Sequence, residues 1–204
     1  MLAWSGILPD SNQAGNWVGA ACMVFLRLFG RSSHKVAASR LYDATVNQSR
    51  RPVFYENIGV PDTINGRFGM IVLHASLILN RLRRIRTHQG RKLTQSFFDT
   101  MFHDIENNLR ELGYADASLG KRVKGMIAGF YGQSHIYEQC LAVSDDRTLY
   151  AALRRNVFEL PADTENMQTI EVMVDYVRQQ AENLAVQDDA ALHSGSIIFE
   201  TPLL

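Results

Sequence analysis

The sequence predicts an all-α protein: a compact single-domain bundle of about six helices, followed by a short extended C-terminal tail. Over several long segments, apolar residues recur at three- and four-residue spacing, which is the period of an amphipathic helix. Between these segments lie Pro52, Pro61, Gly113 and Pro161, residue types that border helices. The chain has 204 residues, of which 46% are hydrophobic, and this suits one domain with a substantial core.

Each helix is placed by its apolar period and by its boundary residues. The clearest one begins at Leu93, carries one apolar stripe and stops at Gly113. The helix before it takes Asp62 as its candidate N-cap, and its middle, residues 70–79, is apolar on nearly every face. His74 in this buried segment is interpreted as a hydrogen-bonded core residue. In order, the expected helices cover residues 35–50, 63 to about 88, 93–112, 121–143, 145 or 146 to about 160, and about 164–186, and residues 196–201 are expected to be extended.

The N-terminal residues 1–25 form an extension ahead of the predicted domain. No run of about 18 apolar residues occurs, so a membrane-spanning helix is not expected. Three interpretations of the extension remain open: a poorly ordered tail, an upstream addition before a start at Met23, or a segment that lies on a membrane surface. The third rests on the alternation of basic and apolar side chains over residues 26–35. Cys22 and Cys140 are far apart in sequence, which favours a reducing compartment.

Charge is balanced over the whole chain but unevenly placed along it. Lysine plus arginine and aspartate plus glutamate each number 21, which argues against a protein that coats nucleic acid, and no DNA partner is expected. Residues 159–190 are strongly acidic, whereas one short stretch is basic. This arginine cluster is interpreted either as a solvated helix end or as a contact with anionic lipid or ribosomal RNA. The cluster consists of Arg81, Arg83, Arg84, Arg86, Arg91 and Lys92.

Motifs for catalysis and cofactor binding are weak. His103 and Glu106, and again His135 and Glu138, form H-x-x-E, whereas di-iron helical bundles use E-x-x-H twice plus two further glutamates. On a helical wheel of about 100° per residue, His103 and Glu106 lie opposite the apolar stripe and would face solvent. Nucleophile elbows and phosphate-binding loops are absent from the sequence. We therefore predict no catalytic residue, metal ligand or cofactor, with a helical di-metal oxidase as the enzymatic alternative.

Three glycines in the helix predicted over residues 121–143 form a second informative pattern. Gly125, Gly129 and Gly132 share one stripe, opposite the apolar residues of the same helix. Because each glycine costs a helix up to about 1 kcal/mol, the stripe requires a reason. Either a neighbouring helix of the same bundle packs closely against it, or it floors a groove that admits a helix from another protein.

Three stretches resemble a known family when they are taken in order: "LYDATVNQSRRPVFYENIGVPDTINGRFGMIVLH", "FFDTMFHDIENNLRELGYADASLGKRVKGMIAGFYG" and "YAALRRNVF". They are similar to the ubiquinol–cytochrome c chaperone family, over about residues 26–158, so residues 26–204 are assigned to a domain of this kind. The resemblance implies a non-enzymatic assembly chaperone that binds newly made cytochrome b and promotes assembly of ubiquinol–cytochrome c reductase. It further implies a bacterial, cytoplasmic protein, peripheral on the inner membrane, with the ribosome and a second assembly factor as candidate partners.

Contact residues for the client are predicted on the turn-rich loop before the central helix and on the glycine stripe. A third function class is kept open beside the chaperone and the oxidase, namely a peripheral membrane scaffold without a client. The predicted partner-binding residues are Tyr55, Asp62, Arg67, Phe68, Gly125, Gly129, Phe130 and Tyr131. The arginine cluster is the predicted membrane or ribosome contact.

Overall fold

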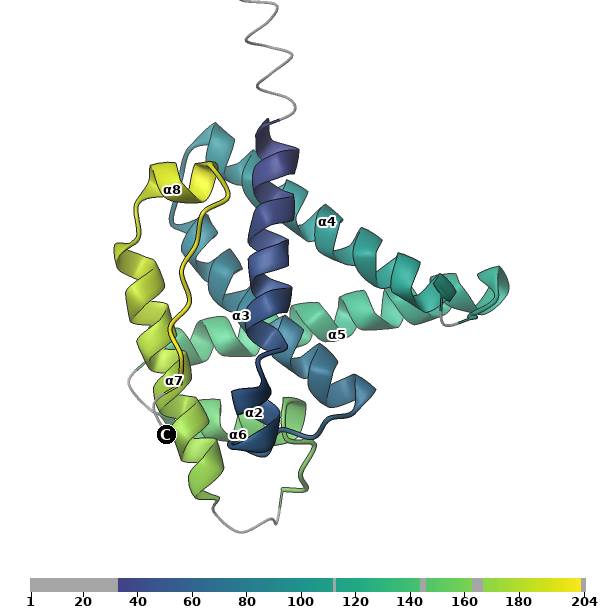
Figure 1. Cartoon of the computed structure of the whole chain (residues 1–204), viewed down its shortest axis with the longest axis vertical. Coiled ribbons are helices and arrows are strands. Elements are labelled where there is room, and N and C mark those ends of the chain that lie inside the picture. Colours follow the sequence, from purple (N-terminus) through teal and green to yellow (C-terminus); the bar gives the residue numbers. More distant parts are fainter. Residues whose placement is uncertain (1–32, 112, 144–145, 163–166, 203–204) are drawn as a thin grey trace, which may run out of the picture.

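The computed structural model describes residues 33–111, 113–143, 146–162 and 167–202 (Figure 1). The N-terminal extension, residues 1–25, lies outside this part of the chain. The described residues are helical without strands, so the prediction of an all-α fold is confirmed. A first helix covers residues 33–49, and it is followed by α2 (Pro52–Glu56), α3 (Ile64–Arg83), α4 (His88–Glu111), α5 (Asp116–Ala142), α6 (Asp146–Asn156), α7 (Gln168–Val186) and α8 (Asp189–His193).

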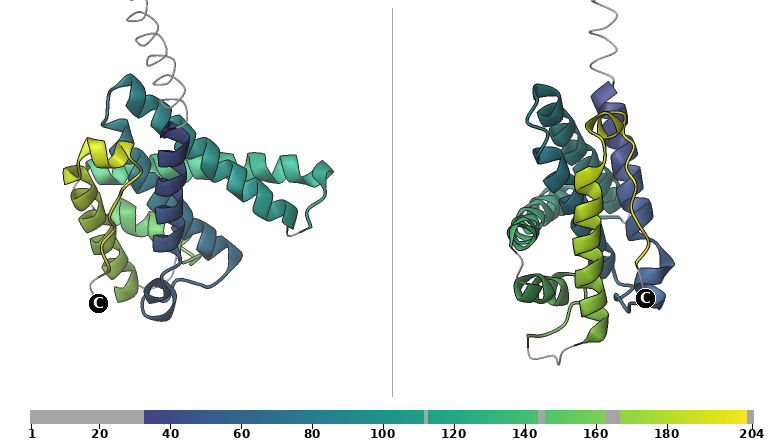
Figure 2. Two further views of the ribbon diagram at one scale, coloured as in Figure 1. Left: turned by 45° about the horizontal axis from the view of Figure 1, so that its top comes forward. Right: turned by 90° about the vertical axis from the view of Figure 1, so that its left-hand side faces the viewer.

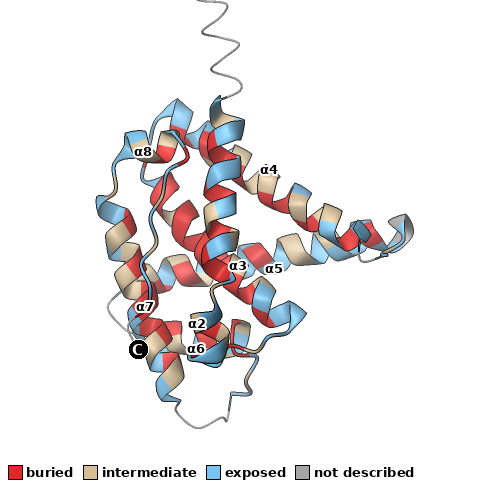
Figure 3. Ribbon diagram, in the orientation of Figure 1, coloured by how far each residue is buried: buried red, intermediate tan, exposed pale blue. Residues whose placement is uncertain are grey.

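The central helix of the fold is α3, as its apolar sequence predicts. It packs against α4, α5 and α7, and nearly all of its residues from Gly69 to Leu82 are buried. Figure 3 shows the buried residues gathered along α3 and on the inner faces of the helices around it. Beyond this body, α4 and α5 continue side by side as a hairpin that projects outward (Figures 1 and 2). None of the helices in the described ranges combines the length and apolarity needed to cross a membrane.

The boundaries of α3 and α4 differ from the prediction. Thr63, not Asp62, caps α3, because the Thr63 hydroxyl accepts a hydrogen bond from the backbone N–H of Gly66 at 2.9 Å. At its other end α3 stops at Arg83, five residues before the predicted end near residue 88. Helix α4 begins at His88, five residues before the predicted start at Leu93. Thr87 explains the early start of α4, because its hydroxyl accepts a hydrogen bond from the N–H of Gly90.

The end of α6 also lies earlier than predicted. The helix stops at Asn156 rather than near residue 160, and Glu159 adopts a left-handed conformation with φ of 56°, which no right-handed helix accommodates. The Glu159 carboxylate accepts a hydrogen bond of 3.0 Å from the Thr63 hydroxyl. The turn after α6 is thereby tied to the first turn of α3.

A buried polar network joins three helices at the centre of the body. His74 on α3 is fully buried, as predicted, and its Nε2 lies 2.8 Å from the Tyr176 hydroxyl of α7. Its Nδ1 lies 2.8 Å from the carbonyl of Met70 and 3.1 Å from the Ser49 hydroxyl. Burial lowers the pKa of His74 to about 4, so the imidazole is neutral in the folded protein.

The C-terminal residues 196–202 are extended and lie on the helices, as predicted. Glutamine side chains form hydrogen bonds with the backbone of this segment, as the backbone of a neighbouring strand would. Gln187 exchanges two hydrogen bonds with the backbone of Ile198, and the Gln180 side chain accepts one from the N–H of Glu200. Phe199 then stacks edge-on against His74, with ring centroids 5.4 Å apart. The segment therefore completes the packing of the core.

Candidate functional site: a glycine-floored groove

A groove of about 610 Å³ lies between the first turns of α3 and the hairpin of α4 and α5. We call it the glycine groove. Its floor contains Gly125 and Gly129 of the glycine stripe on α5, one wall is the start of α3, and the far end is the tip of the hairpin. The residues that line it are Ile64, Asn65, Phe68, Leu109, Tyr114, Ser118, Lys121, Arg122, Gly125, Met126 and Gly129.

The floor of the groove is open. A Cβ atom placed on Gly125, Gly129 or Gly132 would meet no atom within 4 Å, so no helix of the described structure packs against the stripe. The interpretation that a neighbouring helix of the same bundle covers these glycines is therefore wrong. On the opposite side of α5, Phe130 is buried and makes the contact with the body. The stripe leaves the backbone of α5 accessible from outside.

The wall formed by α3 is apolar and unusually exposed. Ile64, in the first turn of α3, has 70% of its surface accessible, and Phe68 lies one turn further along, half-buried. Ile64 and Phe68 both line the groove, so this wall presents apolar surface to it. The rim across the groove is basic, with Lys121 and Arg122 exposed. The Arg122 guanidinium lies 4.5 Å from the ring centroid of Tyr114, which fixes this side chain over the hairpin tip.

The turn-rich loop braces the start of α3 rather than lining the groove. Asp62 forms an ion pair with Arg67, and this raises the pKa of Arg67 and lowers that of the Asp62 carboxyl. The Arg67 guanidinium also lies 5.4 Å from the ring centroid of Tyr55. The Tyr55 hydroxyl in turn donates a hydrogen bond of 2.7 Å to the carbonyl of Ser49. These contacts link the loop to the first helix and hold the α3 wall in place.

The structure divides the predicted partner-binding residues into three groups. Phe68, Gly125 and Gly129 line the glycine groove, whereas Tyr55, Asp62 and Arg67 brace the loop beside it. Phe130 is only 1% exposed and Tyr131 lies on another face of α5, where its ring stacks on Phe98. Burial removes Phe130 from the residues available for contact with a partner.

The arginine cluster is also divided by the structure. Arg81 is buried, and its guanidinium donates to the carbonyls of Leu184 and Gln187 and to the carboxylate of Asp189. It therefore ties α3 to the corner between α7 and α8 and is not exposed for a membrane or a ribosome. Arg83 forms an ion pair of 2.5 Å with Glu138 of α5. The remaining cations, Arg84, Arg86, Arg91 and Lys92, are exposed.

Replacing Arg81 with glutamine is expected to lower the free energy of unfolding by about 2 kcal/mol, because the carbonyls at the α7–α8 corner lose their donors. The matched variant Arg84→Gln changes an exposed side chain of the same cluster and is expected to stay within about 0.5 kcal/mol of the natural protein. Urea denaturation of both variants tests this assignment. Equal stabilities for the two variants would contradict a structural role for Arg81.

The four residues of the di-metal alternative are engaged elsewhere or face solvent. Glu106 accepts from Arg110, Glu138 accepts from Arg83, and His135 lies 3.1 Å from the side-chain amide of Gln139. His103 is exposed on α4. Among the residues that the structure describes, no group of three or more histidine, cysteine or carboxylate side chains is arranged to hold a metal ion. The two H-x-x-E patterns do not converge on one site.

Sequence reasoning missed most of the groove walls. The missed residues come from three helices and from the turn between α4 and α5, and they meet only because the hairpin of α4 and α5 lies beside the start of α3. They are Ile64, Leu109, Tyr114, Lys121 and Arg122. Ile64 offers a partial signal, because it is an apolar residue in the first turn after a turn-rich loop. An all-α body with an open groove of this kind is suited to binding a helical segment of another protein.

Comparisons with known proteins identify the family of this chain. Residues 56–199 match the family model described as Ubiquinol-cytochrome C chaperone. A Xenopus laevis relative, ubiquinol-cytochrome-c reductase complex assembly factor 1, is 29% identical over 166 residues, which cover 81% of each protein. The human protein of the same name is 29% identical over 150 residues, and these span 74% of this chain but 49% of the human one.

A solved structure supports the same family assignment. The crystal structure of the Cbp3 homolog from Brucella abortus superposes with a TM-score of 0.75 at 34% sequence identity, covering 87% of this chain and 97% of that one. The chain belongs to the ubiquinol–cytochrome c chaperone family, and the resemblance read from its sequence motifs is confirmed. Its family is one of assembly factors for respiratory complex III, the ubiquinol–cytochrome c reductase complex.

Proposed function

We propose that this protein is a non-enzymatic assembly chaperone that binds newly made cytochrome b and promotes its incorporation into ubiquinol–cytochrome c reductase. The observation that carries the proposal is the open glycine groove in a chain of this family. A client with membrane helices exposes long apolar segments in water before it is assembled. A chaperone for it therefore needs an accessible surface that accepts an apolar helix without a fixed sequence.

The glycine groove meets this need because its floor lacks side chains. Backbones of two helices approach closely where small residues face each other, and van der Waals contact then replaces side-chain interdigitation. Phe68 and Met126 add half-buried apolar surface next to the floor, and Ile64 adds exposed apolar surface. The groove can thus hold helices of differing sequence, which suits a client with several membrane helices.

The length of the groove favours reversible binding. Its residues on α5 extend from Ser118 to Gly129, which corresponds to about 16 Å along the helix axis. A membrane helix is about 30 Å long, so roughly half of it would remain outside the groove. We infer that the client is held partially and can be passed on during assembly.

The test of the proposed function is the amount of assembled cytochrome b in a strain that lacks the gene. Reduced-minus-oxidised spectra of its membranes are expected to lose the cytochrome b signal of ubiquinol–cytochrome c reductase selectively, with terminal oxidase activity as the control. Restoring the gene should restore the signal. A normal level of the reductase complex would contradict the proposal and favour a scaffold without a client.

A further inference from the structure

The floor of the glycine groove changes character along its length. On α5 the groove extends from Ser118, near the tip of the hairpin, to Gly129, near the body (Figure 1). The cations Lys121 and Arg122 lie in the half near the tip, whereas Met126 and Gly129 lie in the half near the body. Between Lys121 and Gly129 the axis of α5 rises about 12 Å. The two ends of the groove therefore offer different chemistry to a bound molecule.

The two cations near the tip carry charges that no described acidic side chain neutralises. Lys121 and Arg122 are both exposed. The ion pairs among the described residues all use other cations, namely Arg67, Arg81, Arg83, Arg110 and Arg178. The Arg122 guanidinium packs on the ring of Tyr114, and this contact leaves its positive charge in place. Two positive charges are thus available to a ligand in the groove.

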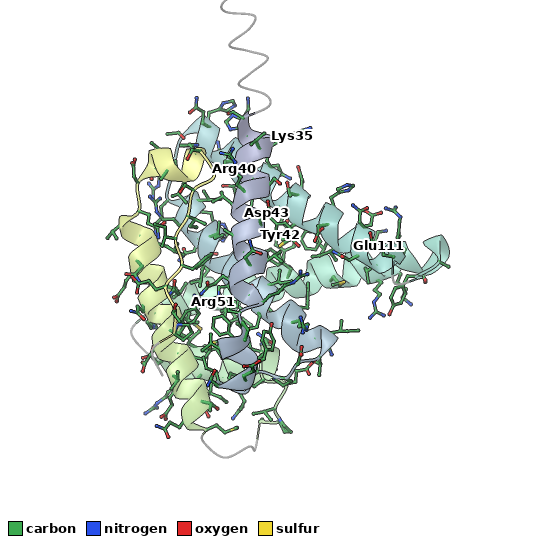
Figure 4. All side chains as sticks on the ribbon, in the orientation of Figure 1. Lys35, Arg40, Tyr42, Asp43, Arg51 and Glu111 are labelled. Carbon is green, nitrogen blue, oxygen red and sulfur yellow. The ribbon has the colours of Figure 1, made fainter. Side chains whose placement is uncertain are left out.

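The described residues that line the groove include no acidic residue. Glu111, the last residue of α4, is labelled in Figure 4 on the projecting hairpin. It follows Leu109 by two residues, which corresponds to about 200° around the helix axis. Leu109 lines the groove, so Glu111 lies on the opposite side of α4. The half of the groove near the tip therefore has a positive potential.

This distribution of charge suits an apolar helix that has acidic side chains at one end. Ile64 and Phe68 of α3 offer apolar surface to the body of such a helix. Its acidic end would lie over Lys121 and Arg122 and be attracted to them. A helix with lysine or arginine at the same end would be repelled. The apolar wall thus provides affinity, and the two cations distinguish one helix end from another.

The bare floor favours a helix over a lipid, although a lipid also combines an apolar body with an anionic end. An acyl chain gains affinity from the side chains that surround it, and Gly125 and Gly129 supply none. A helix brings its own side chains, and its backbone can approach the accessible backbone of α5 closely. The floor is therefore better suited to a helix.

We propose that the glycine groove selects the end of an apolar helix that carries acidic rather than basic side chains, and that Lys121 and Arg122 make this selection. The inference rests on the proposed function and names the part of the client that is held. Cytoplasmic ends of membrane helices are enriched in lysine and arginine, whereas their other ends are not. The groove thereby distinguishes the two ends of a client helix.

The experiment measures binding of the full chain to fluorescent synthetic peptides by anisotropy. The peptides share one leucine- and alanine-rich helix with a glutamine-rich N-terminal end, and they carry either three glutamates or three lysines at the C-terminal end. The glutamate peptide is expected to bind about tenfold more tightly, because the two cations attract it and repel the other. Helix stability favours the lysine peptide, so it cannot produce this preference. Equal affinities, or no binding of either peptide, would overturn the proposal.

The double variant Lys121→Gln, Arg122→Gln is expected to bind the two peptides within about twofold of each other. Glutamine forms helices about as well as lysine and arginine, so circular dichroism should report unchanged helix content. The matched control is Lys124→Gln with Arg84→Gln, which removes the same net charge from exposed positions outside the groove. The control should keep the preference for the glutamate peptide. An equal loss of preference in both double variants would overturn the proposal, because net charge alone would then explain it.

The α3 wall supplies a second readout. The variant Ile64→Gln removes exposed apolar surface from the groove and leaves both cations in place. It is expected to weaken binding of both peptides alike, by about fivefold, without changing the ratio of their affinities. Unchanged affinities for both peptides would place them outside the groove and overturn the proposal.

A lipid ligand is tested by competition. Short-chain phosphatidylglycerol, below the concentration at which it forms micelles, is expected to leave the glutamate peptide bound. Displacement of the peptide from the natural protein, but not from the double variant, would overturn the proposal in favour of a lipid site.

The deletion strain reports on the proposed function separately. Loss of the reductase signal in that strain, without discrimination between the peptides, would retain the assembly role and overturn only the selection of a helix end. Discrimination between the peptides with a normal level of the reductase would support the selection and contradict the assembly role.

Discussion

Replacing Gly129 with leucine is expected to abolish co-purification of cytochrome b while leaving the fold intact. A Cβ at this position meets no atom within 4 Å, so the added side chain is accommodated by the protein itself. Replacing an exposed helical glycine also stabilises the helix, by about 0.8 kcal/mol. The leucine would occupy the floor of the glycine groove and keep a client helix at a distance. Overpacking of a close contact costs roughly 1–3 kcal/mol, which weakens binding between about fivefold and more than a hundredfold.

The matched control for this prediction is Gly120→Leu. Gly120 is also on α5 and also has open space around it, but it does not line the groove. Circular dichroism should report equal or higher helix content for both variants, and affinity purification should report client loss for Gly129→Leu alone. Unchanged capture of cytochrome b by Gly129→Leu would exclude the groove as the client site even if the deletion strain lacks the reductase.

Acidification is expected to destabilise the folded protein through His74. The imidazole has a pKa of about 4 in the folded protein against 6.5 in an unfolded chain, because burial penalises its charged form. Between these values the unfolded chain binds a proton that the folded protein does not, so the free energy of unfolding falls as the pH falls. Across this interval the free energy of unfolding falls by about 3 kcal/mol in all because of His74. Above the unfolded pKa of 6.5, His74 causes no such loss.

The variant His74→Gln isolates this contribution. Glutamine is neutral at every pH and can still reach a hydroxyl partner, but the rings of Phe54, Tyr176 and Phe199 lose a stacking partner. The variant should be less stable at neutral pH and should lose less additional stability on acidification. Urea denaturation at a series of pH values gives both curves, and carboxylates titrate alike in the two proteins. Parallel curves would show that His74 does not govern the acid response.

The long helices could be predicted from sequence because burial imposes a regular period on them. Residues 70–79 are apolar apart from His74 and Ser76, and this correctly placed α3 at the centre. The short helices α2 and α8 were missed, since five residues cannot display a period. Pro52 was interpreted only as the end of the preceding helix, yet it also opens α2, where its missing N–H has no helical partner to lose.

The candidate site was less predictable because it depends on tertiary contacts. The glycine stripe of α5 was visible in sequence, but whether a helix covers it is decided by where the α4–α5 hairpin lies. Arg81 did carry a signal: it follows Leu77 and Ile78 at helical spacing and continues the buried face of α3. Grouping Arg81 with its exposed neighbours was an error, because the grouping relied on the number of basic residues in the stretch and ignored the position of Arg81 on the helix.

The helical body can finish folding only after the extended segment of residues 196–202 has been synthesised. The ring of Phe199 packs against His74, and the backbone of Glu200 accepts a hydrogen bond of 2.9 Å from Gln48 of the first helix. During synthesis on the ribosome, residues near position 48 emerge long before residue 199 is added. The central network can therefore complete its packing only after the segment that carries Phe199 and Glu200 has left the ribosome.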